Sequence, residues 1–222
     1  MTKSNEERGL RDELADYARK LVEMNLLEFK GGNLSARIGD HDMLVTRRSS
    51  AKGAFHDDDV VRTSITELDD NSRLASSTYE IHRAIYLRTD ARAVIHAHPG
   101  QTVSLSLFLD ELIPQDENGM LYLRPKVSVV APPLLFGWNL VADQMAACLE
   151  TENVVVQKWH GTFAKGQDLA EAFHRTRAVE FMSAHLIRIE QLRMSLGDPT
   201  PLPSQMATVI GGVPGRDLKS LA

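Results

Sequence analysis

The stretch Ala93-Val94-Ile95-His96-Ala97-His98-Pro99 determines how the rest of this sequence is interpreted. Its apolar first half predicts a buried strand over residues 93–97, and Pro99 predicts the first turn of a helix. In an extended chain, residues i and i+2 point to the same side. His96 and His98 are therefore expected to reach one ion, while Ala97 faces away from it.

A third histidine, His160, follows the apolar run over residues 154–159, which predicts another strand. Three imidazoles at the ends of two strands suit a catalytic divalent metal ion, with zinc favoured and one coordination position left for a substrate. A His-x-His spacing alone is also compatible with two histidines that are hydrogen-bonded near a strand end. Spacing therefore leaves both interpretations open.

The pattern around these strands predicts one α/β domain, in which helices cover a central sheet. We expect this domain to span residues 1–195 and to be followed by an irregular tail over 196–222, which holds four of the nine prolines. A Ser4-x-x-Glu7 capping box predicts the first helix start. The remaining elements are predicted as helices over about 5–29, 78–88, 140–150 and 169–194 and as strands over 34–38, 43–46, 60–64 and 128–131.

The composition excludes several classes of partner. The chain has 222 residues with 25 Lys and Arg against 30 Asp and Glu, a net charge of −5, which argues against nucleic acid as a partner. Its single cysteine rules out a disulfide framework. No apolar stretch approaches the ~20 residues of a membrane span, and the polar start of the chain is unlike a signal peptide. We expect a cytoplasmic protein with no membrane partner.

Five motifs, taken together and in order, resemble the class II aldolase/adducin family, which includes fuculose-phosphate aldolase and ribulose-phosphate 4-epimerase. The resemblance runs from about residue 6 to residue 193. It implies a single α/β/α domain with a central, mostly antiparallel sheet, assembled as a homotetramer with active sites between subunits. The motifs are Gly31-Gly32-Asn33-Leu34-Ser35, Met43-Leu44-Val45-Thr46, Ser76-Ser77 with His82, His96-Ala97-His98-Pro99 and His160-Gly161.

The resemblance also implies residue roles. The zinc ion, or another divalent metal, would chelate the oxygens of a ketose 1-phosphate and stabilise the enediolate that forms when the C3–C4 bond breaks. Short polar side chains and a helix N-terminus would bind the phosphate group. The metal ligands carry over to His96, His98 and His160, and the phosphate-binding residues to Gly32, Asn33, Thr46, Ser76 and Ser77.

Two positions depart from the family pattern. The family's acid/base Glu, which follows the two serines, is replaced by Thr78, whose hydroxyl has no usable pKa near 7. The family's phosphate loop is replaced by Thr46-Arg47-Arg48-Ser49 with Lys52 after it, and these cations are either anion ligands or a solvated loop. Glu117 is our candidate for the missing acid/base; the alternative is that it belongs to a solvated acidic turn.

The sequence therefore predicts a metal-dependent lyase: a zinc-dependent aldolase that cleaves a phosphorylated ketose to dihydroxyacetone phosphate and an aldehyde. One alternative is another reaction on a sugar phosphate, such as dehydration, 4-epimerisation or decarboxylation. The other is a non-catalytic, adducin-like interaction module, which the replacement by Thr78 favours.

Overall fold

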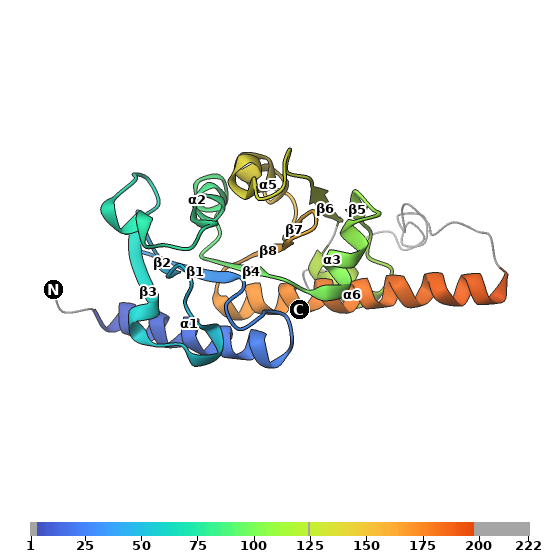
Figure 1. The fold of residues 1–222 in the computed structure, drawn as a ribbon, viewed down its shortest axis with the longest axis horizontal. Helices are drawn as coiled ribbons and strands as arrows, with labels where there is room; N and C mark the ends of the chain where they lie inside the picture. Colours follow the sequence, from blue (N-terminus) through green and yellow to red (C-terminus); the bar gives the residue numbers. More distant parts are fainter. Residues whose placement is uncertain (1–3, 124, 198–222) are drawn as a thin grey trace, which may run out of the picture.

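The computed structural model describes residues 4–123 and 125–197, and within them eight strands form one mixed sheet (Figure 1). The strand order is β3-β2-β1-β4-β8-β7-β6-β5. Neighbouring strands are antiparallel except for the parallel pair β6 and β7. The strands are β1 (Asn33–Ile38), β2 (Asp42–Thr46), β3 (Val60–Ser64), β4 (Ala93–Ala97), β5 (Glu111–Leu112), β6 (Val127–Val130), β7 (Val154–Gln157) and β8 (Gly161–Gly166).

Helices cover both faces of this sheet, with α1 and α6 on one side and α2 and α5 on the other (Figure 1). This arrangement confirms the expected α/β/α architecture. No helix in the described ranges is both long and apolar enough to cross a bilayer. The helices are α1 (Asn5–Glu23), α2 (Tyr79–Arg88), α3 (Gly100–Ser106), α4 (Glu117–Leu123), α5 (Ala142–Cys148) and α6 (Leu169–Leu196).

Each face of the sheet has its own hydrophobic core. On the central strand β4, Val94 belongs to the core under α2 and α5, whereas Ala93 and Ile95 belong to the core under α1 and α6. Because side chains alternate along a strand, His96 lies on the same face as Val94 and therefore faces α2. This alternation brings a polar ring to the edge of an apolar core.

The first helix is shorter than the sequence predicts. Ser4 caps it as expected by accepting a hydrogen bond from the Glu7 N–H, but α1 ends at Glu23 rather than near residue 29. Asn25 takes a left-handed conformation (φ 56°), which is incompatible with a right-handed α-helix. The apolar periodicity of the sequence continues past the end of the helix because Leu26 and Leu27, which lie in the following loop, are also buried in the core.

The second half of the chain holds elements that sequence patterns did not predict. The strand expected over 154–159 ends at Gln157, and the chain reverses at once into β8, which is a central strand of the sheet. A short helix, α4, begins at Glu117, in the segment for which the sequence offered an acidic turn as the alternative to a catalytic role. The long last helix runs to Leu196, two residues further than predicted, and the predicted irregular tail otherwise lies outside the described residues.

Truncating the core under α2 tests this packing. Ile85 is fully buried, whereas Leu87 on the same helix is 52% exposed. We expect Ile85→Ala to lower the free energy of unfolding by about 2–5 kcal/mol, because it removes buried apolar area and leaves a cavity. The matched Leu87→Ala change should cost less than about 0.5 kcal/mol. Urea denaturation at one protein concentration measures both; equal losses would contradict the layer assignment.

Candidate metal centre

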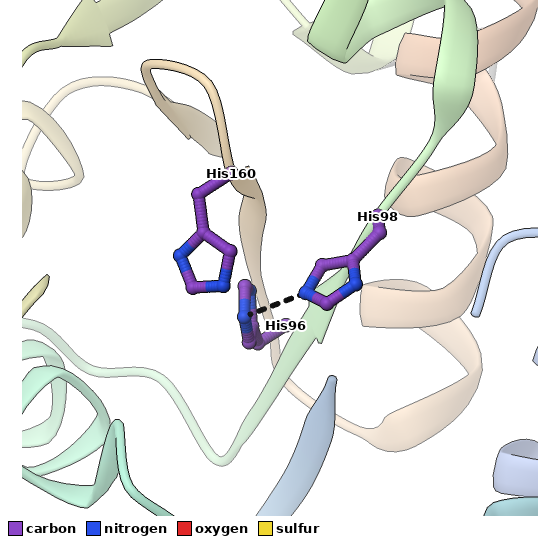
Figure 2. Close-up of side chains that lie close together, drawn as sticks. All are labelled: His96, His98 and His160. Atoms are coloured by element: carbon purple, nitrogen blue, oxygen red, sulfur yellow. Dashed lines mark hydrogen bonds between the residues drawn. The ribbon is translucent and has the colours of Figure 1, made fainter. Parts of the chain in front are cut away.

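Three imidazole rings converge at the end of β4 (Figure 2). His96 comes from β4, His98 follows it directly, and His160 lies in the turn between β7 and β8. One nitrogen from each ring lies within 4.8 Å of the other two, and the Nε2 atoms of His96 and His98 are 3.2 Å apart. The structure thus brings together all three of the predicted metal ligands.

The other nitrogen of each ring is held by an acceptor. The Nδ1 of His96 donates to the Thr162 carbonyl at 3.0 Å, and the Nδ1 of His98 lies 2.6 Å from the Glu28 carboxylate. The Nδ1 of His160 donates to Gln157 Oε1 at 2.7 Å. The amide orientation of Gln157 is itself fixed, since its Nε2 donates to the Trp138 carbonyl at 2.8 Å. These contacts leave each Nε2 free to offer a lone pair, which is how second-shell groups orient metal-binding histidines.

Two glycines permit this close approach of the backbone segments. A Cβ on Gly161 would lie 2.3 Å from the Ala97 carbonyl oxygen and 2.7 Å from Cδ2 of His98. Gly32 has φ +57°, and a Cβ there would lie 2.5 Å from the His96 carbonyl oxygen. A side chain at either position would displace the strand that carries the imidazoles.

Burial keeps the imidazoles of His96 and His160 uncharged near neutral pH. Burial, with the neighbouring rings adding to it, lowers the pKa of His96 well below its usual value. Burial, together with His98, lowers the pKa of His160 to about 4. Phe163 stacks on His96 at 4.2 Å, and Trp138 stacks on His160 at 5.3 Å. Because neutral imidazole is the form that binds metals, the donor set fits a borderline cation such as zinc.

A cavity of about 240 Å³ opens beside the three imidazoles. Gly32, Asn33, Ser76 and Ser77, which were predicted to bind phosphate, line it. Thr46, the fifth predicted residue, is fully buried outside this lining, and its hydroxyl accepts a hydrogen bond from the Leu34 N–H.

The predicted acid/base residue lies elsewhere in this chain. Glu117 begins α4, is exposed, and does not line the cavity. Its catalytic role stays a prediction.

Thr78 has a structural role that the sequence did not indicate. Its side chain is 1% exposed, and its hydroxyl donates to Asn33 Oδ1 at 3.0 Å. The Nε2 of His82 also approaches Asn33 Oδ1, and the His82 Nδ1 lies 2.7 Å from Ser35 Oγ. Since Oδ1 only accepts, both neighbours donate to it, and the amide NH₂ of Asn33 is left for the cavity that this residue lines.

Sequence reasoning missed Glu28 and left the role of Lys52 open. Glu28 follows a helix that we expected to run past it, and its carboxylate orients His98. Burial raises the pKa of Glu28, but the hydrogen bond with His98, a backbone hydrogen bond and the nearby charges of His98 and His160 together lower it. Lys52 lines the cavity and is 2% exposed, whereas the sequence left open whether the cations of its loop are anion ligands or solvated. The roles of both residues depend on tertiary contacts, which local sequence patterns do not reveal.

Comparisons with known proteins agree with this geometry. The sequence profile described as Class II Aldolase and Adducin N-terminal domain matches residues 12–187. The chain is 29% identical over 165 residues to L-fuculose phosphate aldolase of Methanocaldococcus jannaschii, covering 73% of this chain and 87% of that relative. It is 26% identical over 198 residues to methylthioribulose-1-phosphate dehydratase of Microcystis aeruginosa, covering 81% and 96%.

A solved structure shows the same fold. The crystal structure of L-fuculose-1-phosphate aldolase from Thermus thermophilus superposes with a TM-score of 0.77 and 28% identity. The match covers 87% of this chain and 98% of that one.

The imidazole cluster predicts the metal content of the purified protein. We expect about one divalent ion per chain, and a loss of most of it in His160→Ala, because two imidazoles alone make a weak site. Gly161→Ala should also lose metal, through the clash with the Ala97 carbonyl. Gly100→Ala is the matched control, since its Cβ would meet no atom within 4 Å. Elemental analysis after dialysis measures all four proteins; equal metal content in the Gly161 variant would contradict the site geometry.

The neutral imidazoles also predict how stability depends on pH. With metal removed by chelator, the unfolded chain binds protons on His96 and His160 near pH 6.5, whereas the folded chain binds them only well below that pH, near the pKa of about 4 in the case of His160. The unfolded state thus holds more protons in this window, so the free energy of unfolding falls as pH falls from about 6.5 toward 4, by up to about 1.4 kcal/mol per pH unit for each such histidine. Urea denaturation should show a shallower slope for His160→Gln; a slope unchanged in that variant would be against the assignment.

Proposed function

This chain belongs to the class II aldolase and adducin family, and we propose that it is a zinc-dependent lyase that cleaves a phosphorylated ketose to dihydroxyacetone phosphate and an aldehyde. One observation carries the proposal. The three converging imidazoles line the same cavity as the short polar side chains expected to bind phosphate. A metal site and an anion site that share one cavity suit a substrate with a phosphate at one end and vicinal oxygens beside it.

The anion end of the cavity is built from α2 and the loop before β1. Asn33 presents its amide, and Ser76 and Ser77 precede the N-terminus of α2. In the described part of the chain, the backbone N–H groups of Ser77 and Thr78 donate to no other residue. Free N–H groups and the positive end of a helix favour a phosphate dianion.

His96, His98 and His160 would hold the metal ion, and zinc is our choice because all three ligands are imidazole nitrogens. When bound there, the ion supplies Lewis-acid stabilisation of the negative charge that develops on substrate oxygens. The stacking of Trp138 on His160 covers one side of that centre. The protein's own contribution is to orient the ligands and to fix the phosphate end of the substrate.

Proton transfer needs a group other than Thr78, whose hydroxyl is buried and donates to Asn33. Glu117 is our candidate, and because it lies outside the cavity of its own chain it would act in the cavity of another copy. This assignment rests on the proposed homotetramer with active sites between subunits. We further propose that the protein works in the cytoplasm on a small phosphorylated sugar.

Dehydration of a sugar phosphate is the second candidate. The methylthioribulose-1-phosphate dehydratase relative matches more of the chain than the aldolase relative does, at similar identity. Both reactions place negative charge on the carbon next to the carbonyl and on the carbonyl oxygen, so the same metal and phosphate sites would serve either. What separates them is the group that leaves, an aldehyde in one case and water in the other.

The test is turnover of several ketose 1-phosphates by zinc-loaded protein. We expect release of dihydroxyacetone phosphate in a coupled spectrophotometric assay, loss of that release with chelator, and its return on adding zinc. Glu117→Gln should lower kcat by about 10²-fold or more if Glu117 transfers the proton, with little change in KM. Glu111→Gln, an exposed carboxylate in the preceding strand, is the matched control.

Mass spectrometry of the same reactions distinguishes the alternatives. Loss of water from a ketose 1-phosphate without dihydroxyacetone phosphate would replace the aldolase with a dehydratase. Absence of turnover together with absence of bound metal would favour the non-catalytic, adducin-like module.

A further inference from the structure

Lys52 is a buried cation that has no acidic ion-pair partner among the residues that the structure describes. It lies in a short 3₁₀ turn, Lys52–Ala54, and its side chain is 2% exposed, the largest of the fully buried side chains. Its ammonium donates to the Ser50 carbonyl at 3.1 Å and to Ser50 Oγ at 2.9 Å. No carboxylate in residues 4–123 or 125–197 forms an ion pair with it; Asp59 acts on it only at longer range.

A buried cation of this kind lowers the stability of the folded protein when no ligand is bound. Removing an ammonium from water is strongly disfavoured unless an opposite charge compensates it, and two neutral acceptors do so only partly. Burial lowers the pKa of Lys52 to about 8, against a smaller opposing effect of Asp59, so the group still carries its charge at pH 7. An apolar residue of the same length would pack here at lower cost, which indicates that the charge has a use.

The backbone holds this lysine beside the candidate phosphate site. The Lys52 N–H donates to the Phe29 carbonyl at 2.8 Å, which ties its turn to the loop before Gly31. Phe29 also lies against Gly53, where a Cβ would be 2.5 Å from the ring. Through these two contacts Lys52 lines the same cavity as Asn33.

The ammonium of Lys52 has two partners among the described residues and one donor without a partner there. Ser50 accepts two of its three donors, and the hydroxyl of Ser50 donates in turn to the Arg47 carbonyl at 2.9 Å. Ser50 is itself 4% exposed, so this support is rigid rather than solvated. The remaining donor is available to a ligand that enters the cavity.

We propose that Lys52 is the charge partner of the substrate's phosphate dianion, kept without a carboxylate so that the ligand completes its ion pair. The inference rests on the proposed function and deepens it, because it makes the phosphate charge, rather than the sugar, the feature that this cavity selects. Lys30 and Arg48 also line the cavity but are exposed, and solvent screens their charge. Selection by charge is therefore assigned to Lys52 alone among these cations.

The test compares zinc-loaded wild type with Lys52→Met, an apolar change of similar length. Without added anion, the Met variant should unfold at the same temperature as the wild type or higher, because it removes an uncompensated buried charge. Inorganic phosphate should raise the unfolding temperature of the wild type more than that of the Met variant, with acetate at equal ionic strength as the monoanion control. KM for a phosphorylated ketose should rise roughly tenfold to a hundredfold, the loss of one charge-assisted hydrogen bond, and kcat should change less.

Two further variants keep the outcome decisive. Lys30→Met removes an exposed cation from the same cavity and should keep most of the phosphate response. Lys52→Gln replaces the Met variant if the latter does not fold, with the same expectation. A Lys52 variant that folds and responds to phosphate as the wild type does would overturn the inference, as would one that is destabilised at every phosphate concentration with KM unchanged.

This result is separable from the proposed function. If no sugar phosphate is turned over, yet phosphate stabilises the wild type and not the Lys52 variant, the lyase proposal fails while the charge partner stands. If a ketose phosphate is cleaved equally well by both proteins, the lyase stands and the role of Lys52 falls.

Discussion

The pairing of β4 with β8 is the constraint on which the site depends. It places Phe163 opposite His96 and Thr162 opposite Ala97. One strand thereby supplies the ring that stacks on His96 and the carbonyl that fixes its Nδ1. The same pairing carries His160 to the cluster, because that residue lies in the turn immediately before β8. Gly161 is what permits it, since a methyl group there would meet the carbonyl of Ala97.

Sequence patterns predicted most local elements of this fold, including the central strand β4, but missed its neighbour β8. The bounds of β3 and β4 follow from runs of apolar and β-branched residues that signal a strand by themselves. β8 has glycine at both ends and a lysine within it, so its own propensity is weak. It is a strand because β4 and β7 flank it on both sides, which is a property of the assembled sheet rather than of six residues.

The candidate site was likewise predictable from the sequence only in part. The three histidines were predictable because each follows an apolar run, and strand ends gather functional groups. The contribution of Glu28 was not predictable, because it depends on where α1 ends. The burial of Lys52 was not predictable either, because it depends on a loop that packs against Phe29. A lysine among polar neighbours has the same local pattern whether water or protein surrounds it. Residue identity thus indicated the chemistry, and tertiary contacts determined which groups share the cavity.

The hydrogen bond from Thr78 to Asn33 determines what a glutamate, the residue that the family resemblance implies at position 78, would meet in this chain. A carboxylate has no proton to give at neutral pH, so a glutamate there would face Asn33 Oδ1 as a second acceptor. The amide would have to rotate, and His82, whose Nε2 also donates to that oxygen, would lose its acceptor. A change from threonine to glutamate at position 78 would therefore require at least two other side chains, Asn33 and His82, to rearrange.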